Sequence, residues 1–360
     1  MTEIDCAIVG AGIHGLCAAF WLSRRGKRVV VLDRHGPGHA LGGSHGATRI
    51  TRSSYHEADL VRLATEAHQD AWPTLERELG TALRAATPGL FFGPPDGPFG
   101  DYLRATLAAG VAVEAIPPTT ARRLFPLLRI EDDDAVLLDH TAAMILAGKT
   151  MERLRSWLHA HGATFGWNMP ARNLVADVDS VRIETSSGTV RARSAVVSAG
   201  AWSHELEPSM PVTTVLRQEV GYFDLDAPTA RTRVGAFPVW ARIARANDFV
   251  YGLPDHADAG TKAARHVTVG EGTDPDDEPP AIDRLALLDL AREHFAVPVR
   301  GLRAAEHCLY AMTPGQSFRV ARSPLSSRIV QVTACSGHSF KFGPVIGRAA
   351  ADLAMDLAVG

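Results

Sequence analysis

The sequence predicts a mixed α/β and α+β protein, in which a Rossmann-like dinucleotide-binding domain is interleaved with a second, strand-rich domain. The first observation is a strand–turn–helix–strand pattern within residues 4–33, with glycines at the turn. The second is an apolar strand that meets a small-residue turn at 195–202, and the third is a strand and helix after residue 329. The two later segments indicate that the chain returns to the sheet begun by its first strand.

The glycine turn at residues 10–15 has the pattern G-x-G-x-x-G. Gly10 permits a tight turn, Gly12 lets a pyrophosphate approach the backbone, and Gly15 lets the helix pack closely on the strand. The unpaired N–H groups at the start of that helix would face the phosphates. The alternative is a chance glycine cluster in an ordinary βαβ unit.

An acidic residue, Asp33, closes the second strand at 29–32. Its carboxylate can accept hydrogen bonds from both hydroxyls of an adenosine ribose, and it would repel a 2′-phosphate. The strands and the acid therefore favour a dinucleotide site and argue against NADP.

Composition excludes several classes of protein. The chain has 360 residues, 46% of them hydrophobic, and a net charge of -3 with mixed signs, which gives no footprint for nucleic acid or an anionic membrane. Four cysteines do not form a disulfide framework in a chain of this length. We expect no signal peptide and no membrane span, and hence a cytoplasmic protein.

After Asp33 the first half of the chain alternates loops, helices and short strands. The stretch 35–46 reads as a glycine-rich loop that could lie along the cofactor, and Arg49 and Arg52 would share a face if they lay on a helical turn. The remaining elements expected here are an amphipathic helix at 57–79 bent or restarted at Pro73, a strand at 89–92, a helix at 102–109, a strand at 111–116, a short helix at 119–128 and a helix at 149–161.

The second half is richer in strands. Residues 181–190 read as a hairpin, and a strand-rich section runs from 215 to about 307. A strand at 329–334 and a closing helix at 344–357 complete the chain. We expect the dinucleotide-binding domain to comprise residues 1–82, 141–212 and 308–360, and the second domain residues 83–140 and 213–307.

Several motifs in this order and spacing resemble the FAD-dependent amine oxidases of the D-amino-acid-oxidase superfamily, and most of all the branch of monomeric sarcosine oxidase, N-methyltryptophan oxidase and pipecolate oxidase. The resemblance covers essentially the whole chain. The stretches that carry it are 43–52, 196–202, 217–223, 308–310 and 336–342.

The resemblance implies an FAD-binding Rossmann-like domain and a substrate domain whose large mixed β-sheet roofs the flavin. It implies oxidation of the C–N bond of a secondary amino acid, N-methylated or cyclic, to an imine that hydrolyses in water. A hydride equivalent would pass to FAD, and O2 would then be reduced to H2O2. It also implies a monomer that binds a small amino acid, without nucleic acid or membrane.

By the same resemblance Cys308 would attach FAD covalently, as a thioether to the flavin 8α-methyl group. His45 and Arg49 would lie against the flavin ring, where positive charge favours the anionic reduced form. Ser339 replaces a glycine that is common in the family. The positions that match cofactor contacts are Gly10, Gly12, Ile13, His14, Gly15, Asp33, Arg34, Ser44, His45, Arg49, Thr51, Gly200, Trp202, Cys308, Gly337, His338, Ser339, Phe340 and Lys341.

The resemblance also assigns residues to the reaction. Lys262 would stand near flavin N5 and stabilise the charge that develops on O2. Arg52 and Lys341 would hold the substrate carboxylate, one as a planar fork and the other as a point charge. The residues that would contact the reacting groups are Lys262, Arg49, His45, His266, Tyr251 and Tyr310, of which the two tyrosines would also close over the substrate amine. Nearby, Arg265 stands where relatives can carry an aromatic residue.

Other interpretations remain open. The flavin could pass electrons to another acceptor, which would make the protein a dehydrogenase, or the chain could be a flavoprotein subunit that needs a partner chain. By sequence alone Lys262 could be a solvated surface group and Cys308 a buried structural thiol. The histidine spacing suggests no metal site, and the substrate side chain stays undetermined.

Overall fold

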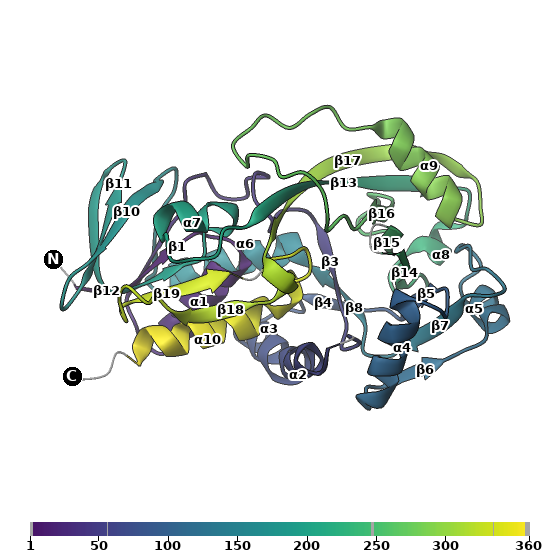
Figure 1. Cartoon of the computed structure of the whole chain (residues 1–360), viewed down its shortest axis with the longest axis horizontal. Coiled ribbons are helices and arrows are strands. Elements are labelled where there is room, and N and C mark those ends of the chain that lie inside the picture. The colour runs from purple at the N-terminus through teal and green to yellow at the C-terminus, as the bar shows by residue number, and fades with distance from the viewer. Residues whose placement is uncertain (1–2, 56, 246–247, 334, 357–360) are drawn as a thin grey trace.

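The computed structural model describes residues 3–55, 57–245, 248–333 and 335–356. Its named strands form three sheets, and Figure 1 shows the first sheet with its helices on the left and the second sheet on the right. Two long strands, β13 (Thr214–Leu225) and β17 (Val299–Met312), lie side by side along the upper part of the molecule and join these halves. Within the described ranges, no helix is long and apolar enough to cross a membrane.

The first sheet has the predicted Rossmann-like core. Its central strand β1 (Ile4–Val9) is parallel to β2 (Val29–Leu32) on one side and to β12 (Gly188–Val197) on the other, and α1 (Ile13–Arg24) connects β1 to β2. Alternate residues of β1 enter hydrophobic cores on opposite faces. The other strands of this sheet are β9 (Thr164–Gly166), β10 (Ala171–Ala176), β11 (Val181–Thr185), β18 (Arg319–Arg322) and β19 (Ile329–Thr333).

The last helix of the chain, α10 (Gly343–Met355), packs directly on α1. Glycines make this close approach possible, because a Cβ on Gly343 would lie 2.4 Å from Cγ1 of Ile13 and one on Gly347 would lie 2.5 Å from Cβ of Cys17. The strand β19 that precedes α10 is parallel to β12. The start, the middle and the end of the chain thus meet in one sheet, as predicted.

The second sheet is the large mixed sheet. Its order is β17-β13-β16-β15-β14-β5-β7-β6, and all of its pairs are antiparallel except β14 with β5. Together the two sheets confirm the predicted fold class. The strands not yet given bounds are β5 (Gly89–Gly93), β6 (Val113–Ala115), β7 (Ala135–Asp139), β14 (Val239–Arg245), β15 (Asp248–Leu253) and β16 (Thr261–Arg265).

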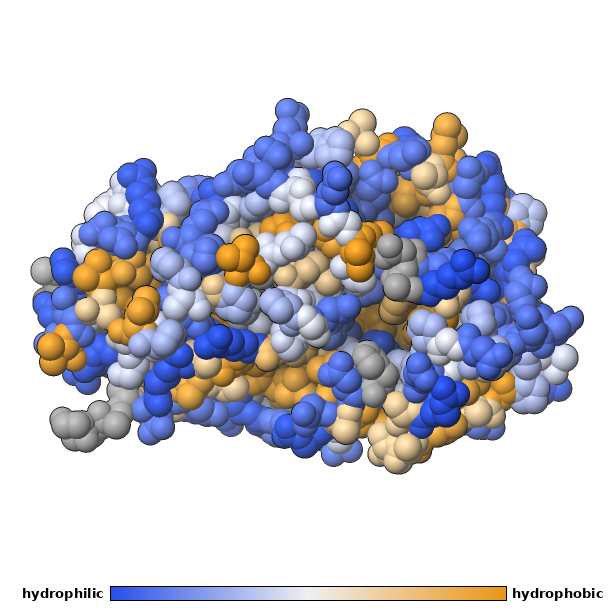
Figure 2. Space-filling model, in the orientation of Figure 1, coloured by the Kyte–Doolittle hydropathy of each residue, from blue (hydrophilic) through white to orange (hydrophobic). Residues whose placement is uncertain are grey.

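A small third sheet has the order β3 (Thr48–Thr51), β8, β4, and both of its strand pairs are antiparallel. Figure 2 shows hydrophilic side chains around most of the rim of the molecule, with apolar side chains more frequent inside that rim. The remaining elements are β4 (Arg84–Ala86), β8 (Ala143–Leu146), α4 (Pro98–Ala108), α5 (Pro118–Leu124), α6 (Ala147–Ala160), α7 (Ser203–Leu206), α8 (Thr229–Thr232), α9 (Arg284–His294) and 3-10 turns at Gly200–Trp202, Pro314–Gln316 and Phe340–Phe342.

Arg49 and Arg52 do not lie on a helical turn, which was the condition for their sharing a face. Thr48–Thr51 form strand β3, which pairs with β8 in an antiparallel ladder, and Arg52 follows directly after it. Three of the four strand residues are β-branched, and such side chains favour extended backbone over helix. The two arginines do not share a helical face.

The helix expected at 57–79 is interrupted earlier than predicted. It is divided into α2 (Ala58–Glu66), a π-helical turn (Ala67–Ala71) and α3 (Trp72–Glu78), so Pro73 lies at the second position of a new helix, where proline is tolerated.

Smaller differences concern boundaries and omissions. The helix expected at 102–109 begins four residues earlier, and that expected at 119–128 ends at Leu124, since Phe125 precedes a proline and leaves the helical conformation, with φ -127° and ψ 67°. Strands β7 and β8 and helix α9 were not predicted. Residues 334 and 357, the expected ends of the last strand and helix, lie outside the described residues.

Candidate functional site

The glycine turn forms the floor of a groove at the carboxyl ends of β1, β2 and β12. Gly10 has φ +103°, and a Cβ there would lie 2.5 Å from the carbonyl oxygen of Ser198. A Cβ on Gly15 would lie 1.9 Å from the carbonyl oxygen of Gly10, so only a glycine at this position lets the helix pack this closely against the turn. The turn therefore has the close strand–helix packing of a dinucleotide site. The groove is a cavity of about 760 Å³.

Asp33 lies at the end of β2 and is fixed by backbone groups. Its two carboxylate oxygens accept hydrogen bonds from the backbone N–H of Ala11, at 2.7 Å, and of His35, at 2.9 Å. An ionised carboxylate can accept about four hydrogen bonds, so two positions remain for ribose hydroxyls in the groove. The side chain lines the groove as predicted from its position after the strand.

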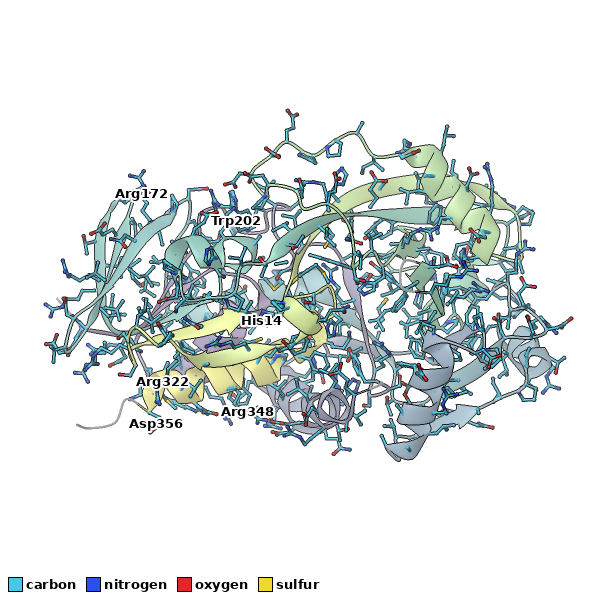
Figure 3. The ribbon with its side chains drawn as sticks, viewed as in Figure 1. His14, Arg172, Trp202, Arg322, Arg348 and Asp356 are labelled. Carbon is cyan, nitrogen blue, oxygen red and sulfur yellow. The ribbon has the colours of Figure 1, made fainter. Side chains whose placement is uncertain are left out.

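His14 and Trp202, both labelled in Figure 3, line the same groove from α1 and from the turn after β12. The Nε2 atom of His14 is buried without a hydrogen-bond partner, and burial lowers the pKa of this imidazole to about 4. Trp202 donates its indole N–H to Asp276 at 3.0 Å, and Arg34 stacks over the indole at 4.8 Å. The orphaned nitrogen of His14 indicates that this groove is built for a further polar group.

The loop between β2 and β3 closes the groove. The hydroxyl of Ser44 accepts a hydrogen bond from the N–H of Ile13, at 3.1 Å, in the first turn of α1. The ring nitrogens of His45 lie 2.7 Å from the carbonyl oxygen of Gly42 and 2.6 Å from that of His307. This histidine thus joins the loop to β17.

A second cavity of about 570 Å³, here called the inner cavity, adjoins the groove. The two share wall residues, among them His45, Ser339 and Phe340. Besides the shared residues, the predicted site residues that line the inner cavity are Arg49, Arg52, Tyr251, Lys262, His266, Cys308, Tyr310, Gly337, His338 and Lys341. They come together from five parts of the chain.

Strand register explains why one face of the second sheet carries so many of these groups. Lys262 on β16 is paired with Tyr222 on β13, and Val220, two residues earlier on β13, is paired with Glu306 on β17. Because side chains alternate along strands, Lys262, Tyr222 and Glu306 project from the same face. Cys308 lies two residues after Glu306 and projects from that face as well.

Lys262 is 3% exposed, and its Nζ lies 3.6 Å from Oε1 of Glu306. Burial lowers the pKa of Lys262 to about 8, and Arg49 acts in the same direction while Glu306 opposes it. The hydroxyl of Tyr222 donates to the same Glu306 oxygen at 2.6 Å. Lys262 is therefore a buried ammonium group that loses its proton at a lower pH than an exposed lysine does.

Arg52 and Lys341 line the same cavity and come from separate elements of the chain. Arg52 Nε donates to the hydroxyl of Tyr102 at 3.1 Å, and Lys341 Nζ donates to the carbonyl oxygen of His338 at 3.0 Å. Both cations lie over the ring of Tyr55, at 4.4 and 5.6 Å from its centroid. Among the ion pairs of the described residues, neither cation has a carboxylate partner.

The positive charges of Arg52 and Lys341 repel each other. Lys341 is 6% exposed. Burial, reinforced by the charges of Arg52 and Arg49, holds the pKa of Lys341 well below its usual value. An anion bound between Arg52 and Lys341 would relieve this repulsion.

Neutral aromatic groups complete the inner cavity. The hydroxyl of Tyr310 lies 3.3 Å from Nδ1 of His266, and burial lowers the pKa of His266 to about 4. Burial also raises the pKa of Tyr251 to about 12, and that of Tyr310 well above its usual value. At neutral pH these three side chains are therefore uncharged.

The turn at residues 336–342 accommodates Ser339 without strain. Ser339 has φ -89°, an ordinary value for any residue. The left-handed conformations fall on Ser336, with φ 44°, and on Gly337, with φ 72°. A Cβ on Gly337 would lie 2.3 Å from the ring of Tyr310, so this glycine allows the turn to contact the tyrosine.

Two predicted residues do not line either cavity. Gly15 acts through packing, and Thr51 is buried with its hydroxyl 2.6 Å from Nε2 of His68. Arg265 also points away, and its Nη1 lies 3.4 Å from Oδ1 of Asp248. Among the described residues, no group of three or more His, Cys, Asp or Glu side chains is placed to hold a metal ion.

Several functional groups were not predicted from the sequence. Glu306 was not singled out from the sequence, yet its side chain is only 30% exposed and lines the inner cavity. Its separation of two residues from Cys308 was the available signal. Tyr55, whose buried hydroxyl has no hydrogen-bond partner, and Tyr102 had no signal beyond their closeness in sequence or space to Arg52.

Comparison with known proteins shows the family of the chain. The family model described as FAD dependent oxidoreductase matches residues 5–353. The chain is 30% identical to peroxisomal sarcosine oxidase of Mus musculus, with 98% of this chain and 92% of that protein covered. It is 28% identical to N-methyl-L-tryptophan oxidase of Yersinia pestis, with 98% and 95% covered. The open form of NikD, an unusual amino acid oxidase essential for nikkomycin biosynthesis, superposes with a TM-score of 0.86 at 25% identity, covering 99% and 95% of the two chains.

Proposed function

Because the chain belongs to the FAD-dependent oxidoreductase family, we propose that it oxidises the C–N bond of a secondary amino acid, N-methylated or cyclic, to an imine and reduces O2 to H2O2. Sarcosine oxidases and N-methyl-L-tryptophan oxidase are its relatives. The single observation that carries the proposal is the pair of buried cations, Arg52 and Lys341, in a cavity that adjoins a dinucleotide groove.

The cation pair calls for an anionic substrate group. Arg52 uses Nε to bind Tyr102, which leaves its other N–H groups for the cavity, and Lys341 has donors besides the one it gives to a carbonyl oxygen. A carboxylate fits a planar guanidinium fork and a nearby ammonium. Binding it would place the neighbouring amine nitrogen toward Tyr251, Tyr310 and the face of the second sheet.

The groove has the features that FAD requires. The glycine turn, the carboxylate of Asp33 and the orphaned nitrogen of His14 fit the phosphates and ribose of the cofactor. FAD, when bound, supplies the two-electron oxidation of the amine and the transfer of electrons to O2. The protein supplies binding, orientation and charge.

Lysine is used sparingly in this chain, which favours a chemical role for Lys262. Four of the 37 Lys and Arg residues are lysines, namely Lys27, Lys149, Lys262 and Lys341, and two of these line the inner cavity. In the other ion pairs of the described residues the basic partner is arginine or, in two cases, histidine. A compact ammonium with an adjustable pKa suits Lys262 for stabilising negative charge on oxygen during its reduction.

The neutral groups orient the substrate amine. His266, Tyr251 and Tyr310 are uncharged at neutral pH, so they add no like charge beside the amine. Their rings also exclude water from that side of the cavity. A secondary amine in its neutral form can release its α-hydrogen with the electron pair, and this step requires no carboxylate base.

Covalent attachment of FAD through Cys308 is part of the proposal. The thiol lines the inner cavity, half-buried, and Arg49 is near enough to its sulfur for their charges to interact. The sulfur is the nucleophile that such an attachment requires. We also propose a cytoplasmic monomer, and a division into a cofactor domain (1–82, 141–212, 308–360) and a substrate domain (83–140, 213–307).

The proposed function is tested by supplying the purified protein with sarcosine, other N-methyl amino acids, proline and pipecolate. We expect at least one to reduce the flavin without oxygen, and to release one H2O2 per amine oxidised in air. Flavin reduction without peroxide would instead identify a dehydrogenase. If no secondary amino acid reduces the flavin, the proposal is wrong.

A further inference from the structure

We infer that Glu306, held in place by Tyr222, is the counter-charge that keeps Lys262 protonated in the inner cavity, and so acts as a positioning residue for the oxygen step. The sequence resemblance and the comparisons assign no role to Glu306 or Tyr222. The oxygen part of this inference rests on the proposed function, whereas the charge pairing can be tested without turnover.

The three side chains come from three adjacent strands. Glu306 on β17 and Lys262 on β16 flank β13, and Tyr222 lies on β13 between them. The Lys262 Nζ is 3.6 Å from Glu306 Oε1, and the Tyr222 hydroxyl donates to that same oxygen at 2.6 Å. The ammonium also lies 5.3 Å from the centre of the Tyr222 ring. The tyrosine therefore contacts both charged partners and fixes the distance between them.

The other groups around Lys262 make a counter-charge necessary. Arg49 on β3 repels the ammonium, and burial raises the pKa of Tyr251 on β15 to about 12, so that its hydroxyl supplies no charge at neutral pH. His45 lies near Glu306 on its other side. Glu306 is thus the carboxylate that faces this group of cations.

The ionisation of the pair agrees with its geometry. Burial alone would raise the pKa of Glu306, but Lys262 and the Tyr222 hydroxyl outweigh burial and keep this pKa below its usual value. Glu306 is therefore ionised at neutral pH. Its charge raises the pKa of Lys262 against burial and Arg49, with about 8 as the result.

A pKa of about 8 places Lys262 where small changes decide its charge. An ammonium stabilises negative charge on oxygen, and a neutral amine does so far less. An opposite charge within about 4–6 Å commonly shifts a pKa by about 1–3 units. Removing the charge of Glu306 should therefore leave Lys262 largely neutral at pH 8.

The test is a pH titration of Lys262 by NMR in the FAD-loaded protein, labelled with 13C at the lysine ε-carbons. Because the chain has four lysines, four signals are expected, and Lys262→Met identifies the relevant one. In Glu306→Gln its midpoint should fall by about one to three pH units. Glu306→Asp keeps a carboxylate, so the Lys262 midpoint should fall less than in Glu306→Gln. Tyr222→Phe also keeps the carboxylate and should likewise give a smaller fall.

Glu219→Gln is the matched control. Glu219 lies on β13 next to Val220, so its side chain projects from the opposite face of the sheet. There its carboxylate accepts a hydrogen bond from the backbone N–H of Asp283. The Lys262 midpoint should stay unchanged in this variant. With a substrate, Glu306→Gln should slow flavin reoxidation by about five-fold or more at pH 8, and leave anaerobic flavin reduction near normal.

The outcomes separate the two proposals. An unchanged Lys262 midpoint in Glu306→Gln would overturn the charge pairing. If that variant fails to fold, an unchanged midpoint in both Glu306→Asp and Tyr222→Phe would overturn it equally. A shifted midpoint with normal reoxidation at pH 8 would overturn the role in the oxygen step. A shifted midpoint in a protein that oxidises no secondary amino acid would uphold the pairing and refute the proposed function.

Discussion

The carboxylate site can be tested by replacing Arg52 with glutamine, which removes the charge while keeping a similar length. The neighbours of Arg52 remain satisfied in this variant, because the Tyr102 hydroxyl still donates to Ser54. The variant also loses the contacts of the guanidinium with the rings of Tyr55, Phe91 and Tyr102, but these rings stay packed, since Phe91 and Tyr102 contact each other and Tyr55 contacts Phe342. We therefore expect the protein to fold, with an unfolding midpoint close to that of the parent.

The expected magnitude follows from the bonds that are lost. A hydrogen bond to a charged group contributes about 1.5–3 kcal/mol. Because about 1.4 kcal/mol corresponds to a factor of ten, the apparent KM should rise about 10- to 150-fold. One effect opposes this loss: without Arg52 the pKa of Lys341 rises, so a larger share of Lys341 carries charge. The double variant with Lys341→Met should therefore lose more than the sum of the single effects.

The assay compares the best amino-acid substrate with its decarboxylated analogue, using initial rates of H2O2 release. The analogue should be poor for the parent, and Arg52→Gln should make it little worse. Arg24→Gln is the control, since Arg24 forms a surface ion pair with Glu78 far from the cavity. Equal losses for both substrates would refute the carboxylate site, and with it the assignment of an amino acid as substrate.

Four further predictions concern other parts of the site. Acid-precipitated protein should stay yellow, and Cys308→Ser should release its FAD to the supernatant. Lys262→Met should slow flavin reoxidation by about 10²–10³-fold while anaerobic reduction stays near normal, as stopped-flow absorbance would show. Because Lys341 must be protonated to bind an anion and its pKa is lowered, the affinity for acetate should fall as pH rises through that pKa, measured by flavin difference spectra. Gly15→Ala should lower the free energy of unfolding by about 1–3 kcal/mol or more, since its Cβ would lie 1.9 Å from a backbone oxygen, whereas Gly301→Ala meets no atom within 4 Å and should change it little in a urea titration.

The elements that could be predicted are those with strong local signals. The glycine turn has a steric reason at Gly10 and at Gly15, and the strands β1 and β2 on either side of α1 are mostly apolar, as is typical of a buried parallel sheet. Strands β7 and β8 could not be found in this way. Both are short, and the ladders that hold them pair them with strands far away in the sequence.

The site could be predicted only where a motif marked it. Cys308, Lys262 and the turn around Lys341 lie in recognisable stretches, whereas Glu306 and Tyr222 become partners through the register of β13 against its two neighbours. Register depends on the whole sheet, and a shift of one residue would have turned either side chain to the other face. Their closeness is therefore a property of the fold.

The arrangement of the first sheet has a consequence for how the chain is made. While a ribosome is still synthesising the second sheet, β1 can pair only with β2 and β12, and the outer neighbour of β12 is missing because β19 is near the end of the chain. The helix α10, which covers α1, follows later still. Contacts between distant segments form slowly, and exposed strand edges promote association. Chains that stop before β19 are therefore expected to aggregate, and a complete cofactor groove should form only after release from the ribosome.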